Sequence, residues 1–193
     1  MFETIATSTA VVALAEIGDK TQLLAILLAT RFRKPVPIIA GILVATLANH
    51  ALAALVGSQV AALLDSLWFR YAIALSFIAM AAWTLVPDKV DDLDDKPARF
   101  GAFITTTVAF FLVEMGDKTQ VATVALGARF HDVISVTIGT TAGMMLANVP
   151  AVFLGQELIE RVPLKIVRFI AAALFLVIGL WLLAQTAGWI TGS

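Results

Sequence analysis

Two copies of one charged motif interrupt long apolar stretches of this chain, and their side chains have the chemistry to hold a cation. EIGDKTQ occupies residues 16–22, and EMGDKTQ occupies residues 114–120. Four carboxylates against two ammonium groups leave an excess of negative charge, which attracts a cation. Oxygen ligands suit Ca²⁺, Mn²⁺ or Mg²⁺ and fit Zn²⁺ or Cu⁺ poorly. The side chains with such oxygens are Glu16, Asp19, Thr21, Gln22, Glu114, Asp117, Thr119 and Gln120.

The same carboxylates can also couple a bound metal to protons. Burial and mutual repulsion favour the protonated form of clustered carboxylates, whereas a metal needs them ionised. A site that alternates between metal-bound and protonated states, and opens to each side of a membrane in turn, is a cation:proton antiporter. Our hypothesis for the two motifs is this exchange.

The motif spacing predicts that the charged side chains share one face of a helix. Glu16, Asp19 and Lys20 lie three and four positions apart, and so do their equivalents in the second copy. Gln22 would point elsewhere on a continuous helix, unless the helix breaks at Gly18. A purely structural alternative stays open, in which acid and lysine of one helix form a pair that only lowers the cost of membrane insertion.

The composition predicts an integral membrane protein. Of the 193 residues 60% are apolar and only 14% are charged, with a mean hydropathy of +0.94. The net charge of −1 gives no case for nucleic-acid binding, and the absence of cysteine excludes disulfides and thiolate metal sites. No Lys or Arg precedes Lys20, so we expect a retained first span rather than a cleaved signal peptide.

The apolar runs predict an all-α membrane protein with six transmembrane helices. Each run is long enough to cross a bilayer as a helix, which satisfies its own backbone in lipid. Polar or proline-bearing segments separate them. The predicted spans are 4–29, 36–60, 67–86, 101–127, 133–155 and 166–188.

The chain is also duplicated. Residues 16–32, with the sequence EIGDKTQLLAILLATRF, align with residues 114–130, with the sequence EMGDKTQVATVALGARF. Three spans per half is an odd number, so the halves insert in opposite orientations, as in many secondary transporters. We therefore expect a first three-helix repeat at 1–86, an acidic cytoplasmic linker at 87–99 and a second three-helix repeat at 100–193.

The distribution of Lys and Arg predicts the orientation. The loops after the first, third and fifth spans lie on one side and carry nine of the thirteen basic residues. Only Arg70 and Arg129 lie on the other side, and Lys20 and Lys118 fall within spans. The basic side is therefore expected to be cytoplasmic, with both termini on the non-cytoplasmic side of the inner membrane.

The repeated Glu-x-Gly-Asp-Lys/Arg-Thr/Ser motif, once per half of a six-span chain, resembles the signature of the Golgi calcium/manganese:proton exchangers. That family includes chloroplast manganese transporters and bacterial manganese exporters. The resemblance implies transport of Mn²⁺ or Ca²⁺ against H⁺, with manganese export favoured for a short, bacterial-type chain. It implies that the cation-binding acids are Glu16, Asp19, Glu114 and Asp117, and that Lys20, Thr21, Lys118 and Thr119 complete the motifs.

Several polar residues outside the motifs have two readings. Asn49 and Asn148 lie at matching places in the second and fifth spans, where helix–helix hydrogen bonding and support of the cation site are equally open. His50 can relay protons, but a packing role is favoured because the other half has no equivalent histidine. The acidic segment 88–96 suits a solvated linker or, less readily, weak cation capture. Arg129 is expected to pair with Asp132.

Other classes of function remain as alternatives to metal exchange. One is an exporter of a cationic organic solute such as a basic amino acid, with the same acids as counter-charges. Another is a non-transporting membrane scaffold. An enzyme is not expected, since the sequence has no GxSxG, no HExxH and no phosphate-binding glycine-rich loop.

Overall fold

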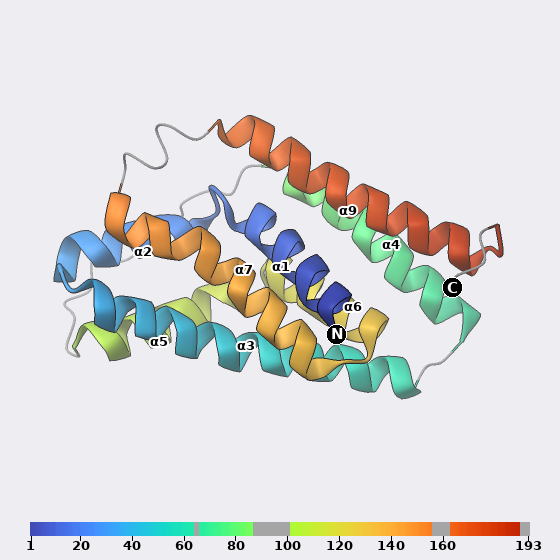
Figure 1. The fold of residues 1–193 in the computed structure, drawn as a ribbon, viewed down its shortest axis with the longest axis horizontal. Helices are drawn as coiled ribbons and strands as arrows, with labels where there is room; N and C mark the ends of the chain where they lie inside the picture. Colours follow the sequence, from blue (N-terminus) through green and yellow to red (C-terminus); the bar gives the residue numbers. More distant parts are fainter. Residues whose placement is uncertain (64–65, 87–100, 156–162, 190–193) are drawn as a thin grey trace.

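The computed structural model describes residues 1–63, 66–86, 101–155 and 163–189, and these ranges contain α-helices without any β-strand (Figure 1). The all-α prediction is confirmed. Four of the helices, α3, α4, α7 and α9, are long and apolar enough to cross a membrane. The helices are α1 (Phe2–Glu16), α2 (Lys20–Phe32), α3 (Pro35–Leu63), α4 (Leu67–Thr84), α5 (Ala102–Glu114), α6 (Lys118–Phe130), α7 (Val133–Leu154) and α9 (Leu164–Thr186).

The segments predicted as spans at 4–29 and 101–127 each consist of two shorter helices, so the helix break that the sequence left open at the motif glycines is present. The breaks fall inside the two motifs, between α1 and α2 and between α5 and α6. Gly18 and Gly116 have φ angles of 80° and 78°, and the residues on both sides of each glycine are extended. Only glycine adopts such a positive φ without a steric cost, so the motif glycine is the residue that permits the break.

The two halves of the chain pack in the same way. α1 lies along α7, and α5 lies along α3 in the equivalent arrangement. A Cβ atom at Gly139 would lie 2.8 Å from Cβ of Ser8, and one at Gly41 would lie 2.8 Å from Cβ of Thr106. These two contacts occupy equivalent positions of the duplicated sequence, so the duplication extends to tertiary contacts. The segment 87–99, expected to be the linker between repeats, lies outside the described residues.

α4 and α9 form a pair that packs along one side of the other helices (Figure 1). Phe77 of α4 and Phe175 of α9 are both buried, with ring centroids 6.2 Å apart. These phenylalanines occupy equivalent positions of the duplicated sequence, so each half of the chain contributes the same residue to the contact between α4 and α9. The pair also contacts α6 and α1, which fixes it to the helices that carry the motifs.

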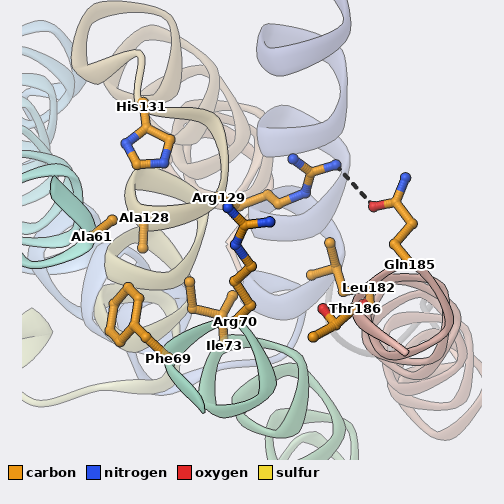
Figure 2. Close-up of a pocket in the computed structure, with 10 residues that line it drawn as sticks. All are labelled: Ala61, Phe69, Arg70, Ile73, Ala128, Arg129, His131, Leu182, Gln185 and Thr186. Atoms are coloured by element: carbon orange, nitrogen blue, oxygen red, sulfur yellow. Dashed lines mark hydrogen bonds between the residues drawn. The ribbon is translucent and has the colours of Figure 1, made fainter. Parts of the chain in front are cut away.

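The ends of α6 and α9 meet near the start of α4, and Arg129 lies there (Figure 2). Its guanidinium donates to Oε1 of Gln185 at 3.3 Å. Asp132 instead accepts from the backbone N–H of Ser135 at 3.0 Å and so caps α7. The expected pairing of Arg129 with Asp132 is thus replaced by a contact to α9, because capping α7 engages the aspartate.

Helices α3 and α6 approach each other backbone to backbone, which fixes the second motif against the first half of the chain. A Cβ atom at Gly57 would lie 2.0 Å from the carbonyl oxygen of Val124. One at Gly127 would lie 2.4 Å from the carbonyl oxygen of Ala54. Small residues at such a crossing allow the close packing that holds membrane helices together.

We expect Gly57→Ala to destabilise the protein by about 1–3 kcal/mol, because the added methyl group overlaps the α6 backbone. The measurement is the thermal unfolding midpoint of detergent-solubilised protein, followed by tryptophan fluorescence. Gly101→Ala is the matched control, since nothing lies within 4 Å of a Cβ atom at that position. Equal midpoints for the two variants would contradict the close crossing.

Candidate cation-binding site

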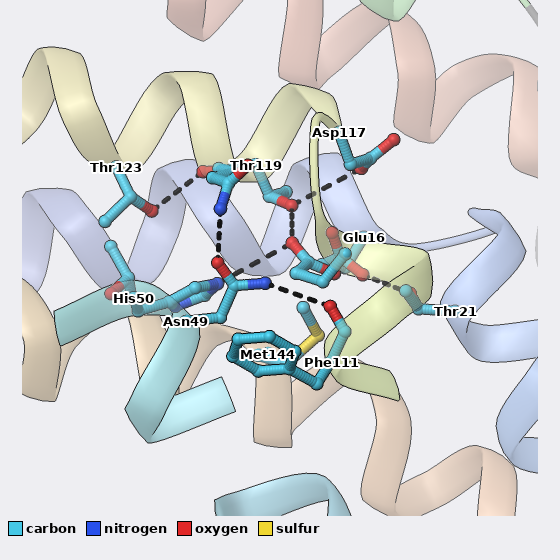
Figure 3. Close-up of polar contacts among 12 residues, drawn as sticks. Glu16, Thr21, Asn49, His50, Phe111, Asp117, Thr119, Thr123 and Met144 are labelled. Atoms are coloured by element: carbon cyan, nitrogen blue, oxygen red, sulfur yellow. Dashed lines mark hydrogen bonds and ion pairs between the residues drawn. The ribbon is translucent and has the colours of Figure 1, made fainter. Parts of the chain in front are cut away.

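The two helix breaks meet inside the protein and bring carboxylates of both motifs together (Figure 3). Glu16, Asp19 and Asp117 each offer one carboxylate oxygen within 4.8 Å of the others. All three side chains are buried. The fourth acid, Glu114, is also buried and belongs to the same polar cluster through its threonine partner. A cluster of buried carboxylates from two distant parts of the chain has the chemistry of a cation site.

The motif lysines form ion pairs across the two repeats. Nζ of Lys20 lies 2.9 Å from Oδ1 of Asp117, and Nζ of Lys118 lies 2.7 Å from Oδ1 of Asp19. The lysine side chains are unequally exposed, at 31% for Lys20 and 5% for Lys118. These ion pairs therefore connect the two motifs, because each lysine reaches the aspartate of the other motif at the helix breaks.

The two glutamates have threonine partners of their own motif. The hydroxyl of Thr21 donates to Glu16, and the hydroxyl of Thr119 donates to Glu114. Oε1 of Glu16 and Oε2 of Glu114 are buried and have no hydrogen bond within the described ranges. Each threonine thus orients a glutamate, and one oxygen of each glutamate stays available to a ligand.

The motif glutamines stabilise the broken backbone. The backbone N–H groups of Gly18 and Gly116 donate to the side-chain oxygens of Gln22 and Gln120, at 2.9 Å and 2.6 Å. The amide nitrogen of Gln22 in turn donates to the carbonyl of Ala147 on α7, at 2.9 Å. Backbone groups freed by a helix break need such partners, since an unsatisfied group costs several kcal/mol in lipid.

The two asparagines differ in their surroundings. Asn49 accepts a hydrogen bond from Gln120 and donates to the carbonyl of Phe111 at 3.5 Å, so it connects α3 to α5 and α6 (Figure 3). The amide nitrogen of Asn148 donates to the carbonyl of Met144 in its own helix, at 3.1 Å. Among the described contacts of these two residues, those of Asn49 are the interhelical ones, which was one of its two possible roles.

His50 lies beside the second glutamate, a placement that sequence reasoning underrated. Its Nε2 atom is 3.7 Å from Oε1 of Glu114, and the residue is fully buried. The other half of the chain has no histidine at the equivalent position, which favours a packing role for His50. The structure instead places its imidazole at the edge of the acidic cluster. The available signal was its position next to Asn49 within an apolar span.

Comparison with known proteins identifies the family of this chain. The family described as "Divalent cation/proton antiporter GDT1" matches residues 4–92 and 102–189. The chain belongs to this antiporter family. The resemblance noted from the motifs is thereby confirmed, and the protein is a membrane transporter of divalent cations and protons, not an enzyme. The two-part match also indicates a repeat.

Individual relatives cover most of this antiporter. A protein of Vibrio cholerae named "Putative manganese exporter" is 51% identical over 177 residues, covering 91% of this chain and 88% of the relative. "GDT1-like protein 5" of Arabidopsis thaliana is 26% identical over 211 residues, covering 90% and 92%. "GDT1-like protein sll0615" of Synechocystis is 25% identical over 185 residues, covering 85% and 88%. No solved structure matches the chain.

We expect the ion pair between Asp19 and Lys118 to show strong coupling in a double-mutant cycle. Either Asp19→Asn or Lys118→Met alone removes one member of a buried ion pair, which costs about 3–5 kcal/mol. The double variant should lose clearly less than the sum of the two, measured as the thermal unfolding midpoint. The control cycle uses two exposed residues, Glu3→Gln and Lys34→Met, which should be additive. Additive losses in both cycles would refute the pair.

Proposed function

We propose that this antiporter exports Mn²⁺ across a bacterial inner membrane in exchange for H⁺. The observation that carries the proposal is the meeting of both motifs at one buried cluster of carboxylates. The oxygen-only donor set suits a hard divalent cation. The name of the Vibrio cholerae relative supports manganese over calcium. Ca²⁺ accepts the same ligands and is the alternative metal.

The proposed cation-binding acids are Glu16, Asp19, Glu114 and Asp117. They come from both halves of the chain, which is where inverted-repeat transporters bind their substrates. The free oxygens of the two glutamates are the natural first ligands, because the two aspartates are held by lysines. Thr21 and Thr119 orient the glutamates, and Gln22, Gln120 and Asn49 hold the breaks in place.

Charge balance explains why metal and protons would exclude one another. The two lysines compensate two of the four acids, so the cluster keeps a charge of −2 when both glutamates are ionised. One divalent cation neutralises that charge, and so do two protons, one on each glutamate. A buried site is most stable when it is neutral. The site therefore accepts either the metal or two protons, and this alternation is the exchange.

We also propose that the chain crosses the membrane six times as two inverted repeats. α1 with α2, and α5 with α6, would each form one crossing that is broken at the motif. In Figure 1 the start of α1 and the end of α9 both lie in the right half of the view, as an even number of crossings requires. The placement of Lys and Arg puts this end on the non-cytoplasmic side.

The packing of α4 and α9 supports an alternating mechanism. This pair contacts α6 and α1, whereas its contacts with the equivalent helices α5 and α2 are fewer within the described ranges. Inverted symmetry allows the opposite arrangement, with the pair moved onto α2 and α5. Exchange of the two arrangements would open the buried site first to one side and then to the other.

The transport test uses purified protein in liposomes that contain a pH-sensitive dye. Addition of external Mn²⁺ should raise the internal pH, because metal entry drives protons out. Glu16→Gln and Glu114→Gln should each lower the rate at least about tenfold by removing a site for both substrates. Glu3→Gln, at an exposed residue of α1, is the matched control and should transport as the wild type does.

The choice of substrate decides between the proposal and its alternatives. A response to Mn²⁺ but not to lysine supports metal exchange, and the relative rates with Ca²⁺ and Mg²⁺ give the metal preference. A response to lysine alone would replace the proposal with export of a cationic organic solute. Folded protein without any proton signal would contradict the exchange mechanism.

The proposed topology predicts the labelling of single cysteines in intact cells, in a chain that has no cysteine of its own. Ser66→Cys, before α4, should react with a membrane-impermeant maleimide, because it lies on the non-cytoplasmic side. Gly101→Cys, before α5, should react only after the cells are opened. Both positions are exposed. The reverse pattern would invert the orientation, and labelling of both in intact cells would overturn the six crossings.

A further inference from the structure

His50 of α3 is a buried polar residue to which the exchange mechanism gives no role. It is fully buried, and neither of its ring nitrogens makes a hydrogen bond within the described ranges. Most buried polar atoms of proteins are hydrogen-bonded, because burial of such an atom without a partner is costly. The position of this imidazole in the middle of an apolar helix therefore needs a reason other than packing.

The imidazole lies beside the carboxylate of Glu114. Its Nε2 atom is 3.7 Å from Oε1 of Glu114, which is too far for a hydrogen bond. Oε1 accepts from the hydroxyl of Thr119, whereas Oε2 is buried and has no hydrogen bond in the described parts of the chain. A neutral imidazole has one nitrogen with a free lone pair. The two neighbouring side chains thus offer one nitrogen and one oxygen that are both available to a ligand.

The distance between these two side chains fits two ligands of one metal ion. Protein ligands lie about 2.0–2.6 Å from a divalent cation, and neighbouring ligands of an octahedral ion are about 90° apart. Two such ligand atoms are then about 2.8–3.7 Å from each other. The 3.7 Å between Nε2 of His50 and Oε1 of Glu114 agrees with the upper end of that range. One ion can therefore contact both side chains.

The preceding residue fixes the imidazole at this place. Asn49 donates to the carbonyl of Phe111 on α5 and accepts from Gln120 on α6 (Figure 3). These bonds hold this turn of α3 against both helices that flank the second motif. A ligand on a regular helix that is held by its neighbours has the fixed position that a binding site requires. His50 thus faces Glu114 from a rigid support.

We propose that His50 is a ligand of the transported ion and that its nitrogen selects Mn²⁺ over Ca²⁺ and Mg²⁺. This inference rests on the proposed metal exchange. The four acids offer only oxygen, which all three ions accept. Imidazole is a ligand of transition metals, whereas Ca²⁺ and Mg²⁺ take oxygen ligands. Mn²⁺ is the transition metal among the three, so a nitrogen in place of one oxygen raises its relative affinity.

The nitrogen ligand is on one side of the acidic cluster. At the place that matches His50, directly after Asn148, the second half of the chain has Val149. The three described carboxylates that lie within 4.8 Å of one another have no histidine in their group. The ion therefore meets nitrogen beside Glu114 and oxygen at the other acids. Selection of the metal then depends on one residue, which can be exchanged without changing any of the four acids.

The direct test is the electron paramagnetic resonance of Mn²⁺ bound to the purified protein in detergent. The wild type should show a coupling of the ion to an imidazole nitrogen, and isotope-labelled histidine should change that coupling. His50→Gln should lose the coupling, whereas His131→Gln should retain it. His131 is exposed and is the other histidine of the chain, so it is the matched control.

A second test compares the rates of Mn²⁺ and Ca²⁺ exchange in proteoliposomes. His50→Gln places an uncharged amide, with an oxygen ligand, near the position of Nε2. The ratio of the Mn²⁺ rate to the Ca²⁺ rate should fall at least about fivefold, while exchange of Ca²⁺ for protons persists. His50→Asn should change the ratio in the same direction. A merely structural role of His50 predicts equal losses for both metals.

The outcomes separate this proposal from metal exchange itself. A wild type that exchanges Mn²⁺ without any nitrogen coupling, or an unchanged rate ratio in both variants, would overturn the role of His50 and leave the exchange intact. A wild type that binds no Mn²⁺ would overturn both. The thermal unfolding midpoint shows whether each variant folds, and the coupling in the wild type decides the question even if neither variant does.

Discussion

The buried carboxylates at the junction of the two motifs are the constraint on which the rest of the structure depends. A membrane interior does not tolerate charge that lacks a partner, so each acid needs a positive group or a proton. The ion pairs at this junction run from one motif to the other. Lys20 pairs with Asp117 and Lys118 with Asp19, so each half of the chain completes the charge balance of the other. The two halves must therefore assemble before either aspartate is compensated.

This exchange of partners is possible only because both motif helices break. The break turns the first turn of α2 and of α6 inward and leaves backbone N–H groups without helical partners. Gln22 and Gln120 accept from those groups at Gly18 and Gly116. The residues of the motif thus have separate tasks, in which glycine permits the break and glutamine stabilises it. The carboxylates of both motifs then lie close together at these helix ends.

The departures from symmetry are as informative as the symmetry. The contacts at Gly41 and Gly139 are equivalent, and both threonines donate to their glutamates. By contrast, His50 adjoins Glu114 with no histidine beside Glu16 in the equivalent place, and Lys20 is far more exposed than Lys118. A carrier that opens to one side at a time must be asymmetric in any single conformation, because its two equivalent halves then face different surroundings.

The sequence alone determined the membrane character, the duplication, the family and the set of acids that gather at the junction. These follow from composition and from a seven-residue motif that occurs twice, and both are local properties of the chain. Tertiary structure decided the rest, because a break in a helix and the partner of a side chain depend on contacts between distant segments. The i, i+4 spacing of Glu16 and Lys20 allows a pair within one helix, and a continuous helix points Gln22 away from them. Only the assembled helices show that the lysines cross between halves, that Gln22 holds the break, and that His50 lies beside Glu114.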